Sequence, residues 1–148
     1  MTVLAGCGAS ATRTPTATVG APSPSDAAVV GRDLTYLRDH SFNVDRRLDV
    51  SLKSVHLHIF HSLCAGSTDG HCQEVAVFRD GQARPIWQRH FTGVRSLKRL
   101  PNGFAITAES YAPSDPLCCP SMAPVTDSYI WTGSGFREKG PLPKPAQG

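Results

Sequence analysis

The sequence lacks several features that would place it in a common functional class. No stretch approaches the roughly 20 consecutive apolar residues of a membrane-spanning helix. The motifs Gly-x-Ser-x-Gly and Ser-x-x-Lys of serine hydrolases are absent, and so is Cys-x-x-Cys, a common spacing of zinc ligands. We therefore expect no cofactor and no catalytic residues, and the sequence disfavours an enzyme.

A strong charge of one sign is also missing. The chain has 15 Lys and Arg against 12 Asp and Glu, a net charge of +3. Its basic residues are dispersed, and the densest group consists of Arg95, Lys98 and Arg99. A nucleic-acid-binding surface is usually more basic and more focused, so we expect no nucleic-acid partner.

Glycine and proline are abundant instead, with 13 and 12 residues in a chain of 148. This composition favours a loop-rich β domain over a helix bundle. The sequence predicts a single β-rich domain over residues 27–140, roughly the size that supports one hydrophobic core. The Pro-rich residues 141–148 are expected to form a disordered tail.

A cysteine near the start follows a short box of small residues, Leu4-Ala5-Gly6-Cys7. The box resembles the lipobox of bacterial lipoproteins, in which the cysteine carries acyl chains such as palmitate. Too few residues precede it for a secretion signal, so we expect residues 1–7 to be the remainder of a signal that starts upstream. Ser, Thr, Ala and Pro dominate residues 8–26, a composition typical of a flexible linker. The sequence thus predicts anchoring through Cys7 on the extracytoplasmic face of the cell membrane.

Four cysteines remain for the domain itself, namely Cys64, Cys72, Cys118 and Cys119. An even number in an exported domain indicates disulfide bonds, with three possible pairings. A bond between the adjacent Cys118 and Cys119 departs from ordinary disulfide geometry. We therefore expect each of them to pair with Cys64 or Cys72, or a single long-range bridge to form.

Hydrophobic periodicity predicts strands over most of the domain. Residues 27–42 have the spacing of one helix, with Asp26 as a possible cap. Hairpin turns are indicated at Asp80-Gly81 and Asn102-Gly103. The predicted strands are residues 55–60, 73–79, 84–91, 94–100, 104–111, 125–131 and 136–139. This pattern predicts an all-β fold, mainly an antiparallel sandwich or a partly open barrel, with one short N-terminal helix.

Histidines are the main candidates for chemistry. On a strand, His56 and His58 would share one face while His61 points to the other, and His71 could complete a metal site from a neighbouring strand. No Asp, Glu or Met lies at a matching spacing, so these are weak candidates and a solvated strand face is favoured. A thiol dyad of Cys72 and His90 is disfavoured, because Cys72 is better used in a disulfide.

Two segments carry a family resemblance. Asp115-Pro116-Leu117-Cys118-Cys119-Pro120-Ser121, followed by Tyr129-Ile130-Trp131, resembles the C-terminal signature of LppP/LprE-type lipoproteins of actinobacteria. Asp69-Gly70-His71-Cys72-Gln73 is similar to an earlier strand of that family, so the resemblance covers roughly residues 55–137. It implies a surface lipoprotein of this fold and assigns no reaction.

Together these features predict a lipid-anchored extracytoplasmic β domain that serves as a binding or cell-envelope interaction module. Its partners would be the membrane, through the anchor, and an envelope component or protein. The alternatives are a His-rich periplasmic metal-binding protein and a small hydrolase.

Overall fold

The computed structural model describes residues 24–67 and 70–145. The predicted signal remnant with Cys7 and the linker up to residue 23 lie outside the described residues. The described chain forms one helix and eight strands. Their bounds are α1 Pro24–Asp39, β1 Phe42–Leu52, β2 Val55–Cys64, β3 Gln73–Arg79, β4 Trp87–Phe91, β5 Val94–Leu100, β6 Gly103–Ser110, β7 Met122–Trp131 and β8 Phe136–Lys139.

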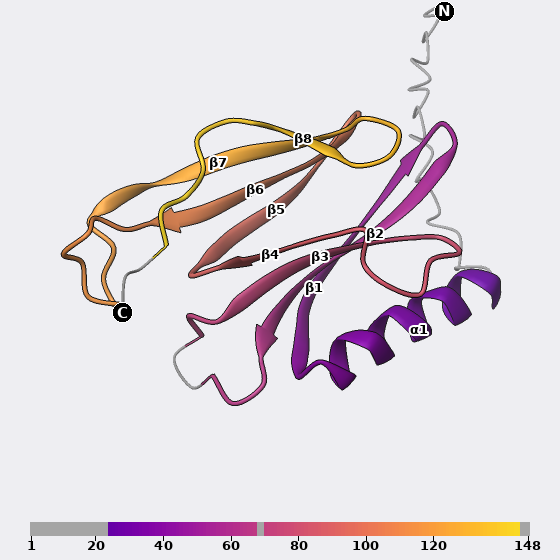
Figure 1. Cartoon of the computed structure of the whole chain (residues 1–148), viewed down its shortest axis with the longest axis horizontal. Coiled ribbons are helices and arrows are strands. Elements are labelled where there is room, and N and C mark those ends of the chain that lie inside the picture. The colour runs from indigo at the N-terminus through magenta and orange to yellow at the C-terminus, as the bar shows by residue number, and fades with distance from the viewer. Residues whose placement is uncertain (1–23, 68–69, 146–148) are drawn as a thin grey trace, which may run out of the picture.

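The strands form two four-stranded antiparallel sheets, each from consecutive strands (Figure 1). The first sheet has the order β1-β2-β3-β4 and the second the order β5-β6-β7-β8. Buried side chains of both sheets form one shared core, as in a sandwich, and the described strands do not close into a barrel. The prediction of an all-β antiparallel fold with one helix is confirmed.

Aromatic rings fill the space between the two sheets. Phe104 is fully buried and stacks on Tyr129, with ring centroids 5.0 Å apart. Trp87 of the first sheet meets the edge of Phe104 at 5.7 Å, and Phe136 approaches Phe104 at 5.2 Å. Stacked and edge-on pairs of this kind add to the stabilisation that burial alone supplies.

Helix α1 covers the other face of the first sheet (Figure 1). The alternation of β2 produces this arrangement, because Leu57 and Ile59 point into the core between the sheets while Phe60 points to the helix. Leu37 of α1 packs with Phe60 and with residues of β3 in a second, smaller cluster.

Several boundaries differ from the sequence-based prediction, and one strand is new. Strand β2 runs to Cys64 instead of 60, β4 begins at Trp87 instead of 84, and β7 begins at Met122 instead of 125. The helix ends at Asp39 instead of 42, and Ser41 with a φ of 64° turns the chain into β1. Strand β1 was not predicted at all. It is an edge strand whose residues are mostly exposed and polar, so it has little of the hydrophobic alternation that marks a half-buried strand.

The cysteines pair locally. Cys64 lies at disulfide distance from Cys72, and Cys118 from Cys119. The expectation that Cys118 or Cys119 would bridge to Cys64 or Cys72 is therefore wrong for this structure. The antiparallel partnership of β2 and β3 carries Cys64 and Cys72 to the same end of the first sheet.

Part of the predicted tail lies against the domain. The described residues 141–145 run beside the end of β6, where the Tyr111 N–H donates to the Lys144 carbonyl at 3.1 Å. The Lys144 N–H donates in turn to Ser110 Oγ at 3.1 Å. This segment thereby forms one wall of a groove described below.

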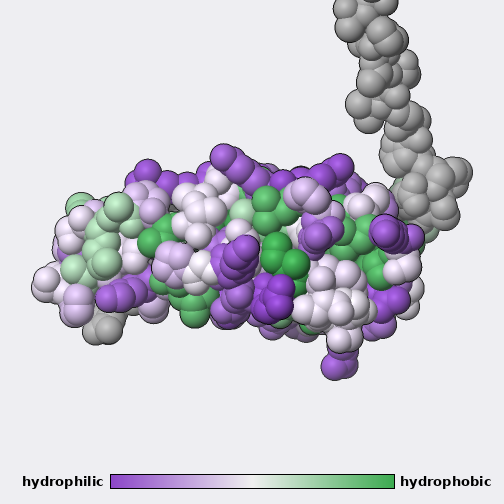
Figure 2. Space-filling model, turned by 90° about the horizontal axis from the view of Figure 1, so that it is seen from above, coloured by the Kyte–Doolittle hydropathy of each residue, from purple (hydrophilic) through white to green (hydrophobic). Residues whose placement is uncertain are grey.

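Helix α1 is too short and too polar to cross a membrane, and it is the one helix among the described residues. On the face of the molecule shown in Figure 2, small hydrophobic patches are interrupted by strongly hydrophilic residues.

Candidate functional site

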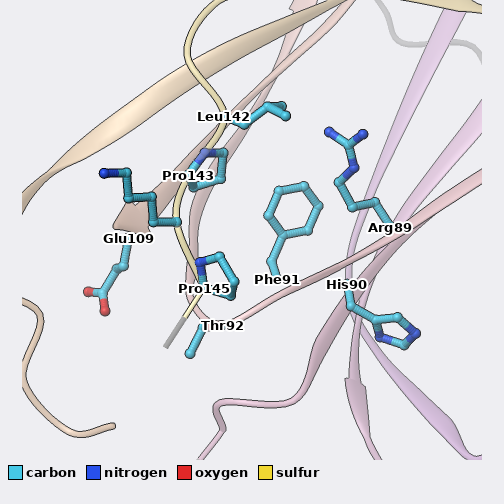
Figure 3. A pocket seen from close by; sticks show the side chains of 9 residues that line it. Arg89, His90, Phe91, Thr92, Glu109, Leu142, Pro143 and Pro145 are labelled. Carbon is cyan, nitrogen blue, oxygen red and sulfur yellow. The ribbon is translucent and has the colours of Figure 1, made fainter. Parts of the chain in front are cut away.

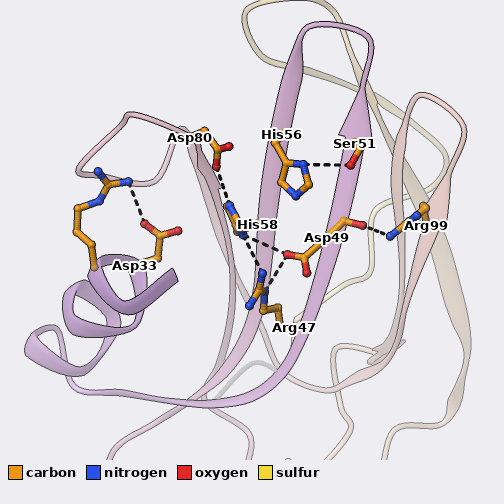
Figure 4. A network of polar contacts seen from close by, with 9 residues as sticks. Asp33, Arg47, Asp49, Ser51, His56, His58, Asp80 and Arg99 are labelled. Carbon is orange, nitrogen blue, oxygen red and sulfur yellow. Dashed lines mark hydrogen bonds and ion pairs between the residues drawn. The ribbon is translucent and has the colours of Figure 1, made fainter. Parts of the chain in front are cut away.

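A polar cluster occupies one end of the first sheet, on the face that carries α1 (Figure 4). His56 and His58 come from β2, and Asp49 lies directly opposite His58 on β1. Each of these three residues offers a possible ligand atom, and the three atoms lie within 4.8 Å of one another. The strand period explains the arrangement, because residues i and i+2 and their cross-strand partners share a face.

His58 lies at the centre of this cluster and is only 2% exposed. Its Nε2 is 2.7 Å from Asp80 Oδ1, at the end of β3. Its Nδ1 is 3.1 Å from Asp49 Oδ1. A buried imidazole therefore has a carboxylate at each nitrogen.

Arg47 joins the two sides of the cluster. Its Nε donates to Asp49 Oδ1 at 2.8 Å, and its Nη2 donates to His58 Nδ1 at 3.2 Å. The guanidinium therefore bridges the carboxylate and the imidazole and supplies a positive charge between them.

A further carboxyl group lies on the helix side. Asp33 of α1 is 1% exposed, and neither of its oxygens has a hydrogen-bond donor among the described residues. Arg32 Nη2 approaches it to 3.6 Å. Burial raises the pKa of Asp33 above its usual range, and the charges of His58 and Arg32 oppose this only in part.

The structure separates the other predicted histidines from this cluster. His61 is buried on the opposite face, where its ring bonds Asp45 Oδ2 at 3.1 Å and Gln73 Oε1 at 2.8 Å. His71 lies beside Cys72, at the other end of β2 and β3. Asp49 takes the place expected for His71. It was missed because its strand, β1, was not recognised in the sequence.

A groove crosses the end of edge strand β4 (Figure 3). We call it the β4 groove. It consists of two hollows of about 250 and 430 Å³ that share His90, Phe91, Thr92 and Pro145. The smaller hollow is further lined by Arg89, Glu109 and residues 142–144, and the larger by Ser67 and residues 71–73.

The smaller hollow is apolar with a charged rim. Phe91, Leu142 and Pro143 face one another across it (Figure 3). Two of its charged groups are neutralised, because Arg89 pairs with Glu138, and Glu109 pairs with Arg95 at 3.0 Å. The ammonium of Lys144 has no ion pair among the described residues.

The larger hollow brings together the two residues that sequence reasoning considered as a thiol dyad. Cys72 and His90 both line it. The Cys72 sulfur, however, is at disulfide distance from Cys64. A disulfide-bonded sulfur is no nucleophilic thiolate.

A buried carboxyl group lies behind this hollow. Glu74 is 2% exposed and opposes His90 across β3 and β4, with Glu74 Oε2 3.2 Å from His90 Nε2. Burial raises the pKa of Glu74, and this effect exceeds the opposing charges of His90 and His40. The folded state therefore holds a proton on Glu74 at a pH where the unfolded chain has released it.

Glu74→Gln should consequently be more stable than the native chain at neutral pH. A raised carboxyl pKa makes the free energy of unfolding fall as pH rises from the unfolded value of 4.5 through the folded value. The amide does not ionise, so the advantage should vanish well below pH 4.5, where both forms are neutral. Urea denaturation of both proteins at acidic and neutral pH measures this difference. A larger advantage at acidic than at neutral pH would contradict the assigned direction.

Comparisons of the chain with protein-family models, curated proteins and solved structures found no match.

Proposed function

We propose that the protein is a lipid-anchored extracytoplasmic binding module, and that the β4 groove takes a small amphipathic anion. The observation that carries the proposal is an apolar hollow whose lining includes Lys144, a lysine with no ion pair among the described residues. Ligand sites are typically apolar concavities with a few charged or polar groups that orient the ligand.

The proposed location on the extracytoplasmic face of the membrane is supported by the lipobox-like segment near the N-terminus and by the cysteines. The Leu4-Ala5-Gly6-Cys7 box supplies a residue to acylate. Two cysteine pairs at disulfide distance suit an oxidising compartment, because disulfides persist outside the cytoplasm and are rare within it.

Mass spectrometry of the membrane fraction of the native host tests this proposed location. We expect an N-terminal peptide that begins with an acylated Cys7. A cytosolic protein that retains Met1 would contradict the anchor, and free thiols at all four domain cysteines would contradict the oxidising compartment.

The proposed ligand follows from the lining. An alkyl chain would contact Phe91, Leu142 and Pro143, and a carboxylate or phosphate would lie near Lys144. Such an anionic group could be the headgroup of a lipid or the acid group of a free acid, and both share this chemistry. A ligand with a neutral polar group would gain no binding free energy from an ion pair with Lys144.

Titration of the ¹⁵N-labelled chain with octanoate tests the groove. We expect amide shifts at Phe91, Thr92 and Leu142, and weaker shifts with 1-octanol, which has the same chain length without the charge. Lys144→Gln should weaken octanoate binding about fivefold, the size of an exposed ion pair. The matched control is Lys98→Gln, which removes an exposed lysine of β5 outside the groove.

Equal effects of octanoate and 1-octanol would show apolar contact without a role for charge. An absence of shifts in the groove at millimolar octanoate would overturn the proposed ligand. Neither result depends on the lipid anchor, so the proposed membrane location and the proposed ligand of the β4 groove are tested independently.

A further inference from the structure

We propose that Asp49, His56 and His58 bind a divalent transition metal ion, with zinc as the reference ion. The three ligand atoms lie within 4.8 Å of one another, and His58 Nδ1 is already 3.1 Å from Asp49 Oδ1. Ligand atoms of a tetrahedral zinc lie about 3.3 Å apart, given bond lengths near 2 Å. Only small side-chain adjustments would make all three atoms converge.

The partners of His58 orient its ring for coordination. The Asp80 carboxylate can only accept a hydrogen bond, so His58 Nε2 carries the proton in their 2.7 Å contact. Nδ1 lies between Arg47, which can only donate, and the carboxylate of Asp49, which can only accept. When Nδ1 accepts from Arg47, its lone pair faces the site, and a metal ion that replaces the guanidinium would bind there. Metal-binding histidines typically donate their second N–H to a carboxylate in this way.

His56 has a similar arrangement. Its Nδ1 is 3.0 Å from Ser51 Oγ, which leaves Nε2 for the shared site. The rings of His56 and His58 lie 5.1 Å apart (Figure 4). Two imidazoles and one carboxylate form a ligand set that suits zinc and leaves a fourth position for water or another ligand.

Arg47 is the natural competitor for this site. Its guanidinium bonds the same Asp49 and His58 atoms that a metal ion would use. The Arg47 side chain is 35% exposed, so it can turn toward solvent when an ion binds. Without a metal ion, the guanidinium of Arg47 therefore occupies the site and must move away when an ion binds. Shortening or neutralising this side chain should strengthen metal binding.

The charges around the cluster are compatible with a bound cation. Asp80 lies at the far side of His58, and the buried Asp33 of α1 faces the same region (Figure 4). Arg32 pairs with Asp33, and Arg99 donates to the backbone carbonyl of Asp49. With Arg47 displaced, the carboxylates of Asp49 and Asp80 would flank the ion and its imidazole ligands.

The test measures zinc affinity of the whole oxidised chain, with Cys7 alkylated, by competition with a chromophoric chelator. Cobalt absorption spectra report the coordination number independently. We expect His56→Gln to weaken zinc binding more than tenfold, because one of three ligands is lost, and Asp80→Asn to weaken it about tenfold through the orientation of His58. His56 is only partly buried, so its variant should keep the fold.

Arg47→Met should strengthen zinc binding by about tenfold, since a charge at this distance changes the proton affinity of a site by at least that factor. Arg46→Met is the matched control. It removes the neighbouring arginine, which bonds Asp45 and the Arg95 carbonyl, and should leave the affinity nearly unchanged. His90→Gln controls for zinc held at an exposed histidine outside the cluster.

Three results would overturn the assignment. They are a native affinity for zinc weaker than millimolar, a loss of binding in His90→Gln with none in His56→Gln, and equal effects of Arg47→Met and Arg46→Met. The readouts are affinity and spectrum, and they stand independently of the β4 groove and of the lipid anchor.

Discussion

Gly103→Ala is expected to destabilise the domain by about 3 kcal/mol or more, a large part of the stability of a typical domain. Gly103 opens β6, and its backbone passes directly beside β7. A Cβ atom at this position would lie 2.0 Å from the Tyr129 carbonyl oxygen. This obstacle is backbone, so no side-chain rotation can relieve the overlap, and the β6–β7 ladder would have to separate.

Urea denaturation compares this variant with Gly31→Ala, which makes the same chemical change in α1. A Cβ at Gly31 meets nothing within 4 Å, and alanine favours helix over glycine by about 1 kcal/mol. The two substitutions should therefore have opposite signs. Native-like stability of Gly103→Ala would show that β6 and β7 tolerate a wider separation than this structure has.

Phe104→Ala should cost about 3–5 kcal/mol, the range for truncating a buried aromatic side chain. Phe104 is fully buried and contacts rings from both sheets, namely Trp87, Tyr129 and Phe136. Its removal would leave a cavity at the centre of the sandwich, which rigid flanking strands can fill only in part. The loss should therefore exceed the transfer free energy of the ring alone.

Phe104→Leu provides the graded control, because it keeps most of the apolar volume and should lose less than half as much stability as alanine. Denaturant midpoints and slopes for both variants separate a loss of stability from a change in compactness. Equal losses for leucine and alanine would assign the effect to aromatic contacts instead of the cavity.

The strands that could be predicted from sequence are those with a buried face. In β2, apolar and polar side chains alternate, and the bounds of β3 were predicted correctly because its centre, residues 75–78, is a continuous apolar run. Asn102-Gly103 also marked the position of the β5–β6 hairpin, although the two turn residues are 101 and 102 and Gly103 already opens β6. These signals are local, so a reading of neighbouring residues suffices.

The candidate sites depended on contacts that no local pattern contains. Asp49 joins His58 only through the cross-strand register of β1, whose polar residues gave no strand signal. The β4 groove needs Leu142 and Lys144, which return to the domain from a segment that composition marked as a tail. Proximity between distant segments is a property of topology, which spacing along the chain does not encode.

Each sheet consists of four strands that are consecutive in the chain, and the described chain passes once from the first sheet to the second, at residues 92–93. Backbone pairing therefore joins segments that are neighbours in the chain, while Trp87 also contacts Tyr129 and Phe136 from the last two strands. Short-range pairing closes small loops, which favours rapid folding. We therefore expect each half of the chain to build its own ladder first, and the ring cluster around Phe104 to join the two halves late in folding.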